Sequence, residues 1–196
     1  MSWLHVALEV IEVVSLAIDV ADKLINVLNK AGVLENTNNS DELGAKVMQA
    51  REINITPPEE RAAYEQYIKQ IDAMEIDPDK NYSAEDKQAA ANEFLSGALN
   101  VVYADDKGVT PFLQEVNAHS SFYEPDQIKA YLDKSAESQL DMGDIGKYFD
   151  DKLDSMQDIL RTEDVLIDAE KSLGLNDDEI KQKFDDERVH RNQDFD

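Results

Sequence analysis

The sequence predicts an all-α protein, and three observations support this prediction. Apolar residues recur at the three- and four-residue spacing of amphipathic helices along most of the chain. Helix-start patterns, in which Ser, Thr or Asn precedes proline or acidic residues, lie between these apolar segments. Only 7 of the 196 residues are glycine, and neither alternating β-branched runs nor Asn-Gly or Asp-Gly pairs indicate strands. We therefore expect a multi-helix bundle of about seven to nine helices, packed around a long apolar N-terminal helix.

The first predicted helix covers residues 2–30, the most apolar part of the chain. Its polar residues recur every three or four positions and leave a wide apolar face on a helix of about 28 residues. Gly32 followed by Val33 predicts a Schellman-type end. Acidic residues within the segment argue against a membrane span, and the basic region and cleavage site of a signal peptide are lacking. We expect a core helix, with a partner-docking surface and a membrane contact as the alternatives.

Later helices are predicted from capping residues and prolines. Their starts are Ser40, Thr56 with Pro57 and Glu59, Ser83, Thr110 with Pro111, Pro125, and Asn176 with Glu179. A longer helix begins near Asp144 and carries apolar residues at helical spacing, namely Ile145, Phe149, Leu153, Met156 and Leu160. It either continues past Thr162 or breaks there, and Gly174 ends the pattern. We expect a single domain over residues 1–190, with a seam at 33–40, a weaker seam at 76–83 and a frayed tail at 191–196.

Charge is the strongest compositional feature of the chain. Its 43 acidic and 19 basic residues give a formal net charge of −24, which repels nucleic-acid phosphates and anionic membrane surfaces. The chain has no cysteine, so disulfides, thiolate metal sites and cysteine nucleophiles are excluded. Because a signal peptide and a transmembrane segment are both lacking, we expect a cytoplasmic protein, with export by a signal-less route as the alternative.

One segment places oxygen-bearing side chains at several positions of an EF-hand calcium loop, namely Asp77, Asp79, Asn81, Ser83 and Glu85. Tyr82 replaces the glycine of the sharp turn and Gln88 replaces the bidentate glutamate, so the match fails at two essential positions. A connection between two helices, with Ser83 as cap, explains the same residues. We expect neither a metal site nor a cofactor. Enzymatic activity is not expected either, because no nucleophile and base have a catalytic spacing and no glycine-rich phosphate loop is present.

An acidic ridge is the most suggestive feature of the second half of the chain. Its residues follow one side of the helix predicted from Asp144 and continue beyond it: Asp144, Asp150, Asp151, Asp154, Asp158, Glu163 and Asp164. Like charges at this spacing destabilise an isolated helix by a few tenths of a kcal/mol per pair. The ridge is either a solvated helix face or a surface complementary to a basic partner.

These observations lead us to expect a non-enzymatic acidic binding protein. In composition alone it resembles bacterial immunity and antitoxin-like proteins, which neutralise a cognate toxin by covering its active surface. A basic toxin would be attracted by the acidic ridge, which would raise the association rate. The alternative is a secreted or surface-acting effector whose apolar N-terminal helix engages a membrane.

Overall fold

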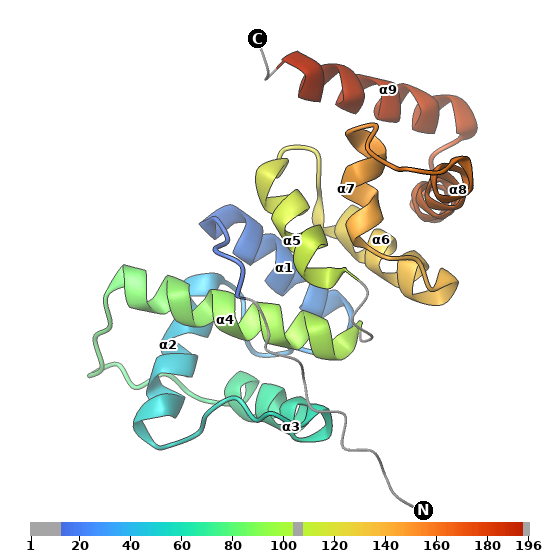
Figure 1. Cartoon of the computed structure of the whole chain (residues 1–196). Coiled ribbons are helices and arrows are strands. Elements are labelled where there is room, and N and C mark those ends of the chain that lie inside the picture. The colour runs from blue at the N-terminus through green and yellow to red at the C-terminus, as the bar shows by residue number, and fades with distance from the viewer. Residues whose placement is uncertain (1–12, 104–107, 194–196) are drawn as a thin grey trace, which may run out of the picture. The chain divides into compact units, whose positions relative to one another are not determined.

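The computed structural model describes residues 13–103 and 108–193 (Figure 1). Within these ranges the chain forms nine helices and no strand, which confirms the all-α class. The helices are α1 (Ile18–Lys30), α2 (Ser40–Glu52), α3 (Arg61–Asp72), α4 (Ala84–Val102), α5 (Val109–Ala118), α6 (Pro125–Ser138), α7 (Gly143–Phe149), α8 (Met156–Ser172) and α9 (Asp177–Gln193). None of these helices, in the ranges described, is long and apolar enough to cross a membrane.

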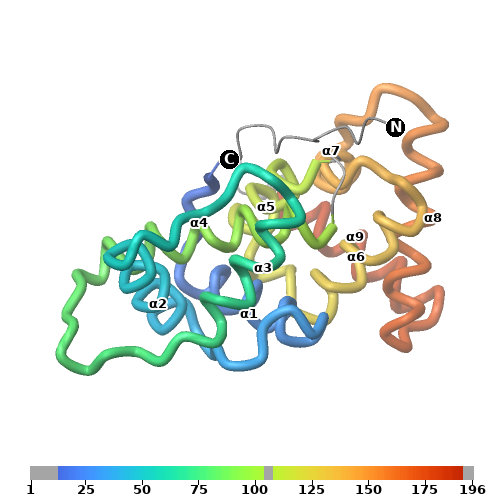
Figure 2. Tube along the Cα trace, turned by 90° about the horizontal axis from the view of Figure 1, so that it is seen from below, coloured from blue at the N-terminus to red at the C-terminus, as the bar shows by residue number. Residues whose placement is uncertain are grey.

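The chain divides into two compact units, Met1–Val102 and Tyr103–Asp196. The two predicted seams are connections inside the first unit, since 33–40 joins α1 to α2 and 76–83 belongs to the open loop between α3 and α4 (Figure 2). A single domain over residues 1–190 stays a prediction.

In the first unit, α4 contacts each of the other three helices. Glycine allows two of these approaches. A Cβ atom on Gly44 of α2 would lie 2.1 Å from the carbonyl oxygen of Lys87, and one on Gly97 of α4 would lie 1.7 Å from the Tyr64 hydroxyl. Any side chain at either position would overlap a neighbouring helix, so these glycines set how closely α2, α3 and α4 pack.

The predicted N-terminal helix is confirmed over residues 18–30 and wrong over residues 13–17. Residues 13–17 are not helical, and α1 begins only at Ile18. Val14 and Leu16 are buried while their neighbours are exposed, which is the two-residue alternation of an extended chain. The Val14 N–H donates to Ser96 Oγ at 3.2 Å, and the Gln88 side chain donates to the Leu16 carbonyl at 3.3 Å. Side chains of α4 therefore satisfy backbone groups that a helix would pair internally. The rest of this prediction, residues 2–12, lies outside the described residues.

Helix α1 itself is a core helix with the predicted end. Val20, Leu24 and Leu28 are fully buried. Gly32 has a positive φ of 70°, and the Val33 N–H donates to the Leu28 carbonyl at 2.9 Å, which is the bond that defines a Schellman motif.

Two predicted helix starts are displaced. Asn39, rather than Ser40, caps α2, because its side chain accepts a hydrogen bond from the Glu42 N–H at 2.9 Å. Helix α3 begins at Arg61 instead of Pro57. The physical reason is Pro58, since a residue that precedes proline is driven out of the helical region, and Pro57 therefore cannot open a helix.

Other predicted starts are confirmed. The Ser83 Oγ accepts from the Asp86 N–H at 3.1 Å at the start of α4. Pro125 is the first residue of α6, behind a capping box of Glu124 and Gln127. Asn176 and Glu179 form the reciprocal capping box of α9, with bonds of 2.9 and 3.1 Å. A third predicted start is displaced, because helix α5 begins at Val109, two residues before Pro111, and its N-cap is Gly108 in a left-handed conformation rather than Thr110.

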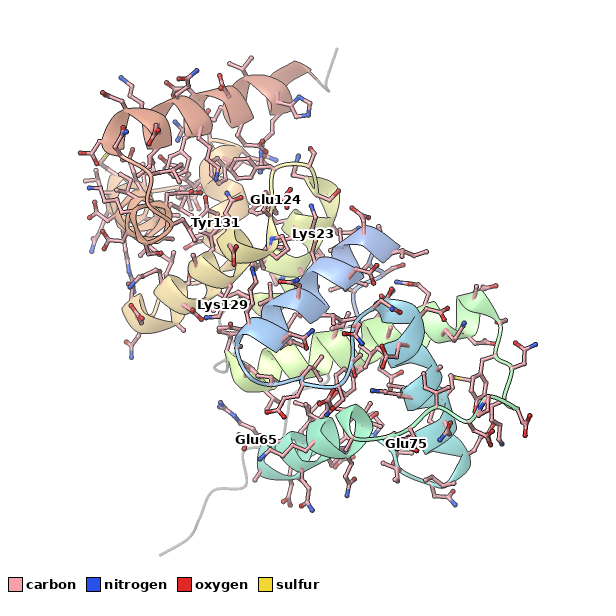
Figure 3. The ribbon with its side chains drawn as sticks, turned by 180° about the vertical axis from the view of Figure 1, so that it is seen from behind. Lys23, Glu65, Glu75, Glu124, Lys129 and Tyr131 are labelled. Atoms are coloured by element: carbon pink, nitrogen blue, oxygen red, sulfur yellow. The ribbon has the colours of Figure 1, made fainter. Side chains whose placement is uncertain are left out.

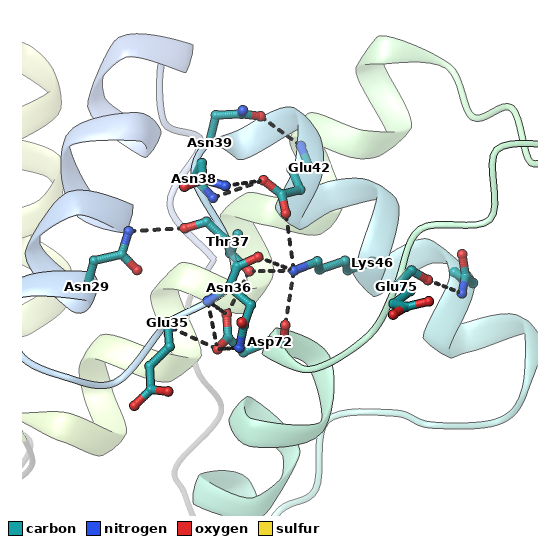
Figure 4. A network of polar contacts seen from close by, with 11 residues as sticks. Asn29, Glu35, Asn36, Thr37, Asn38, Asn39, Glu42, Lys46, Asp72 and Glu75 are labelled. Atoms are coloured by element: carbon teal, nitrogen blue, oxygen red, sulfur yellow. Dashed lines mark hydrogen bonds and ion pairs between the residues drawn. The ribbon is translucent and has the colours of Figure 1, made fainter.

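A buried polar network fixes the connection between α1 and α2 (Figure 4). The Asp72 carboxylate accepts from the N–H groups of Glu35 at 2.8 Å and Asn36 at 3.1 Å, and from the Thr37 hydroxyl at 2.8 Å. Lys46 Nζ donates to the carbonyl oxygens of Asn36 at 2.6 Å and Asp72 at 3.0 Å. Because Asp72 is 5% exposed and Lys46 3%, this network ties the connecting loop to α2 and α3.

The second unit is built around aromatic rings. They meet edge to face, with Phe112 against Tyr123, Phe122 against Phe149, and Phe149 against Phe184, at centroid distances of 5.9, 5.2 and 5.4 Å. Such pairs add about 0.5–1.5 kcal/mol to the burial of the rings. The rings come from α5, α7, α9 and the loop before α6, so they bring the C-terminal helix onto the same core.

Candidate partner-binding surface

The acidic ridge lies on two helices and on the turn between them. Helix α7 ends at Phe149 and α8 begins at Met156, so the prediction of one helix from Asp144 through Leu160 is wrong. The break falls before Thr162, which is buried inside α8. The ridge residues are divided as follows: Asp144 on α7, Asp150, Asp151 and Asp154 in the turn, and Asp158, Glu163 and Asp164 on α8.

Two capping interactions cause this break. Asp151 has a positive φ of 55°, and the next N–H, of Lys152, donates to the Lys147 carbonyl at 2.7 Å and closes α7. Ser155 then opens α8, because its Oγ accepts from the Asp158 N–H at 3.0 Å and donates to the Asp158 carboxylate at 2.6 Å. The pair Ser155 and Asp158 has the spacing of a capping signature, so this start was detectable in the sequence.

Three ridge residues form ion pairs or a helix cap within the unit. Asp144 pairs with Lys147 at 2.8 Å, and Asp158 belongs to the cap of α8. Asp150 accepts from Arg191 at 3.0 Å and pairs with Lys152 at 2.8 Å. Burial raises the pKa of Asp150, but these two bonds outweigh burial and hold that pKa below its ordinary value.

The other ridge residues face outward to different degrees. Asp151, Asp154 and Asp164 are exposed, and Glu163 is half-buried. Asp151 Oδ1 lies 3.9 Å from Arg188 Nε. Asp154 in the turn and Asp164 on α8 are therefore the ridge carboxylates with the smallest role in holding the fold together.

Arg191 anchors α9 beneath this surface. The frayed tail predicted from residue 191 is wrong at its first residue, since α9 continues to Gln193 and Arg191 is 3% exposed. Its guanidinium group binds Glu115, Glu187 at 2.7 Å and Asp150 at 3.0 Å, and it lies 5.0 Å from the Phe149 ring centroid. The only local signal for this role is the four-residue spacing of Glu187 and Arg191, because the other partners come from distant parts of the chain.

Glu170 is a second buried anchor of the same unit. Its side chain is fully buried and accepts from Gln127 at 2.9 Å, from the Tyr131 hydroxyl at 2.7 Å and from Lys183 at 2.9 Å. Figure 3 marks Tyr131 on α6. Burial raises the pKa of the Tyr131 hydroxyl well above its ordinary value, so this group stays a hydrogen-bond donor. The network joins α6, α8 and α9, and α8 is the helix that carries Asp158, Glu163 and Asp164 of the ridge.

Helices α8 and α9 border a cavity of about 380 Å³. Its apolar lining consists of Tyr148, Ile167, Ile180 and Phe184, and its charged lining of Glu163, Asp177, Lys181, Asp185 and Arg188. Glu163 is the ridge residue that reaches this cavity. The Arg188 guanidinium carbon lies 4.5 Å from the Tyr148 ring centroid. Burial raises the pKa of Tyr148 to about 12, although the Arg188 charge opposes the shift.

Two residues predicted for the core lie on the surface instead. Met156 is 69% exposed and Leu160 52% exposed, whereas Ile145 and Phe149 are buried as predicted. Because the chain breaks between α7 and α8, the first residues of α8 point away from the core. The apolar residues before and after the break therefore do not lie on one helix face, although their spacing in the sequence is helical.

The segment with partial calcium-loop character is a helix connection. Ser83 caps α4, Asp77 Oδ1 accepts from the Asp79 N–H at 3.0 Å, and the Lys80 ammonium group pairs with Glu52. Within the part of the chain that the structure describes, no group of three or more His, Asp or Glu side chains could hold a metal ion.

Comparison of the chain with protein-family models, with curated proteins and with solved structures finds no significant match.

Proposed function

We propose that the protein is a non-enzymatic binding protein that engages a basic partner protein through the acidic surface of Tyr103–Asp196. This unit contains 25 acidic and 11 basic residues, a net charge of −14, whereas Met1–Val102 contains 18 and 8, a net charge of −10. The observation that carries the proposal is the combination of exposed carboxylates at Asp154, Asp164 and Asp185 with the partly apolar cavity between α8 and α9. Interfaces combine an apolar centre with charged groups that steer the partner.

The most concrete form of this proposal is an immunity or antitoxin-like inhibitor. A toxin that acts on nucleic acid has a basic cleft for phosphate groups, and the exposed carboxylates of this surface would occupy such a cleft in place of the substrate. Complementary charge raises association rates by orders of magnitude at low salt.

The membrane alternative has less support. The apolar face of α1 is covered by its own unit, so Leu24 and Leu28 do not need a bilayer to leave water. The remainder of the apolar segment, residues 2–12, lies outside the described residues.

Affinity capture with three matched baits tests the proposed function. The baits are the full-length protein, the variant Asp154→Lys/Asp164→Lys/Asp185→Lys, and the control Glu59→Lys/Glu65→Lys/Glu85→Lys. All six positions are exposed, and Figure 3 marks Glu65 on α3. Each triple reversal changes the formal charge from −24 to −18, since each reversal adds two charges. The two variants therefore differ only in where the charge is changed.

We expect a basic protein to be retained by the unchanged protein and by the control, and to be lost from the first variant. With the captured protein purified, the association rate at low salt should fall at least tenfold for the first variant and much less for the control. Equal losses from both variants would show attraction by net charge without a defined surface. Retention of no basic protein by any bait would refute the proposed function.

A further inference from the structure

A stripe of side chains that begins with two exposed apolar residues leads along α8 into the cavity. Met156 and Leu160 are exposed, and Glu163 and Ile167 follow at steps of three and four residues, so all four side chains share one face of the helix. Glu163 and Ile167 line the cavity that α9 completes. The stripe from Met156 to Ile167 is about 16 Å long, from the helical rise of 1.5 Å per residue.

The cavity offers an apolar anchor point at the end of this stripe. Ile180 and Phe184 are almost fully buried within α9 and still border it, together with the Tyr148 ring. The Tyr148 and Phe184 rings stand nearly perpendicular, at 76° and a centroid distance of 6.2 Å. An aliphatic side chain of a partner would meet aromatic and aliphatic carbon there, which is how hot-spot residues are held in interfaces.

The charges beside the stripe favour a basic occupant. Asp154, Asp164 and Asp185 are exposed. The two basic residues of α8 are already engaged. Arg161 donates to the carbonyl oxygens of Ser138 and Gln139, both at 2.8 Å, and Lys171 pairs with Asp177 at 2.8 Å. The cavity is also lined by two cations of α9, Lys181 and Arg188, and Arg188 lies over the Tyr148 ring. Cations of a partner would therefore meet carboxylates that the basic side chains of α8 leave uncompensated.

We propose that the stripe and the cavity bind a basic amphipathic segment of the partner protein, with an aliphatic side chain in the cavity and Lys or Arg opposite Asp154, Asp164 and Asp185. The proposal rests on the proposed function and names the chemistry of the partner. A second copy of the chain is the less favourable occupant, because it would bring two surfaces of a −24 protein together.

Two synthetic peptides test this proposal with the full-length protein. The first has leucines at helical spacing on one face and lysines on the other; the second has the same lysines with serine in place of every leucine. The surface variant is Met156→Gln/Leu160→Gln. The control variant is Ile53→Gln/Ile76→Gln, which changes residues that are 60% and 40% exposed in the first unit. Binding is measured by fluorescence anisotropy at low salt.

We expect the leucine–lysine peptide to bind at least tenfold more tightly than the serine–lysine peptide. The surface variant should lose about tenfold in affinity for the first peptide and keep its affinity for the second. The control variant should bind both peptides as the unchanged protein does. Because all four substituted side chains are exposed, the variants should stay folded.

Equal affinity for the two peptides, or equal losses from both variants, would overturn this inference and leave the proposed function intact. Sedimentation that shows a dimer of the unchanged protein but not of the surface variant would also overturn it, by identifying a second copy as the occupant. The proposed function fails separately, if neither lysine peptide binds more tightly than an acidic peptide of equal length.

Discussion

The two units of the chain solve the problem of packing helices in different ways. Met1–Val102 brings its helices together through small residues, as at Gly44 and Gly97, and holds one loop with the Asp72 and Lys46 network. Tyr103–Asp196 uses large aromatic rings, and it buries the side chains of Arg191 and Glu170. Where two backbones lie in close contact, a larger side chain is destabilising. Where an ion is buried, loss of its partner is destabilising. We therefore expect the most sensitive position to be a glycine in the first unit and a buried charged residue in the second, although the first unit also buries Asp72 and Lys46.

The two units also differ in whether their buried charged residues contact the acidic ridge. Arg191 is the buried ion that supports the acidic surface of the second unit directly, since it binds Asp150 of the ridge. Arg188, which is partly exposed, lies 3.9 Å from Asp151 and lines the cavity. In the first unit the buried network joins the loop between α1 and α2 to helices α2 and α3. We infer that Arg191, a buried charged residue of the second unit, holds part of the acidic ridge in a fixed position.

The largest effect should come from removing the buried cation of the second unit. Arg191→Leu leaves Glu115, Glu187 and Asp150 without their common partner. Breaking a buried ion pair in this way costs about 3–5 kcal/mol of unfolding free energy, which chemical denaturation measures. Lys181→Leu, at an exposed position of the same helix, should change it by less than about 0.5 kcal/mol.

Hydrogen exchange on the Arg191→Leu variant shows how far this loss spreads. Faster exchange confined to residues 108–193 would support two units, and equally faster exchange in residues 13–103 would support the single domain predicted from the sequence. A loss below about 1 kcal/mol would contradict the role given to the buried ions.

The next largest effect should come from adding one carbon atom to the first unit. Gly44→Ala places a Cβ atom 2.1 Å from the Lys87 carbonyl oxygen and forces α2 away from α4, at a cost of about 3 kcal/mol. Gly32→Ala is the matched control, because Gly32 has a positive φ of 70° but open space around it. Left-handed strain alone should cost about 1–2 kcal/mol. Thermal melting should rank the two variants in this order, and the reverse order would show that α2 and α4 can separate at little cost.

Local signals explain which parts of the fold the sequence could predict. The capping box of Asn176 and Glu179 and the cap at Ser83 depend on residues within one turn, so their patterns lead to the correct helix starts. Thr56 and Pro57 form the same kind of pattern, but Pro58 forbids the helix that they suggest. At Ser155 the capping signature competes with apolar residues at helical spacing, and the cap decides where α8 begins.

Non-local contacts explain what the sequence could not predict about the candidate site. The partners of Arg191 come from α5, from the turn after α7 and from α9, and those of Glu170 come from α6 and α9, so no single window of sequence contains them all. The acidic character of residues 144–164 was readable from composition. Some ridge residues, such as Asp150, bind cations of the fold, and others, such as Asp154, are exposed. This division depends on which basic side chains the fold places beside each carboxylate.

The smallest effect, and the one that depends on pH, should come from the loop network of the first unit. Burial raises the pKa of Asp72, but its hydrogen bonds from Glu35, Thr37 and Asn36 outweigh burial and hold the pKa below the ordinary value of 3.8. A carboxylate whose pKa is depressed by folding stabilises the fold above that ordinary value, and the stabilisation is lost as the pH falls through the depressed pKa.

Asp72→Asn should therefore lower the unfolding free energy by about 2 kcal/mol at neutral pH, because hydrogen bonds to a charged group are lost. The difference between the variant and the unchanged protein should shrink as the pH falls below about 4, since protonation then removes the same charge from the unchanged protein. Urea titrations at several pH values measure both quantities. Glu65→Gln, at an exposed position of α3 (Figure 3), should stay within about 0.5 kcal/mol of the unchanged protein throughout. A constant difference for Asp72→Asn down to pH 2 would mean that the network depends on the shape of this side chain rather than on its charge.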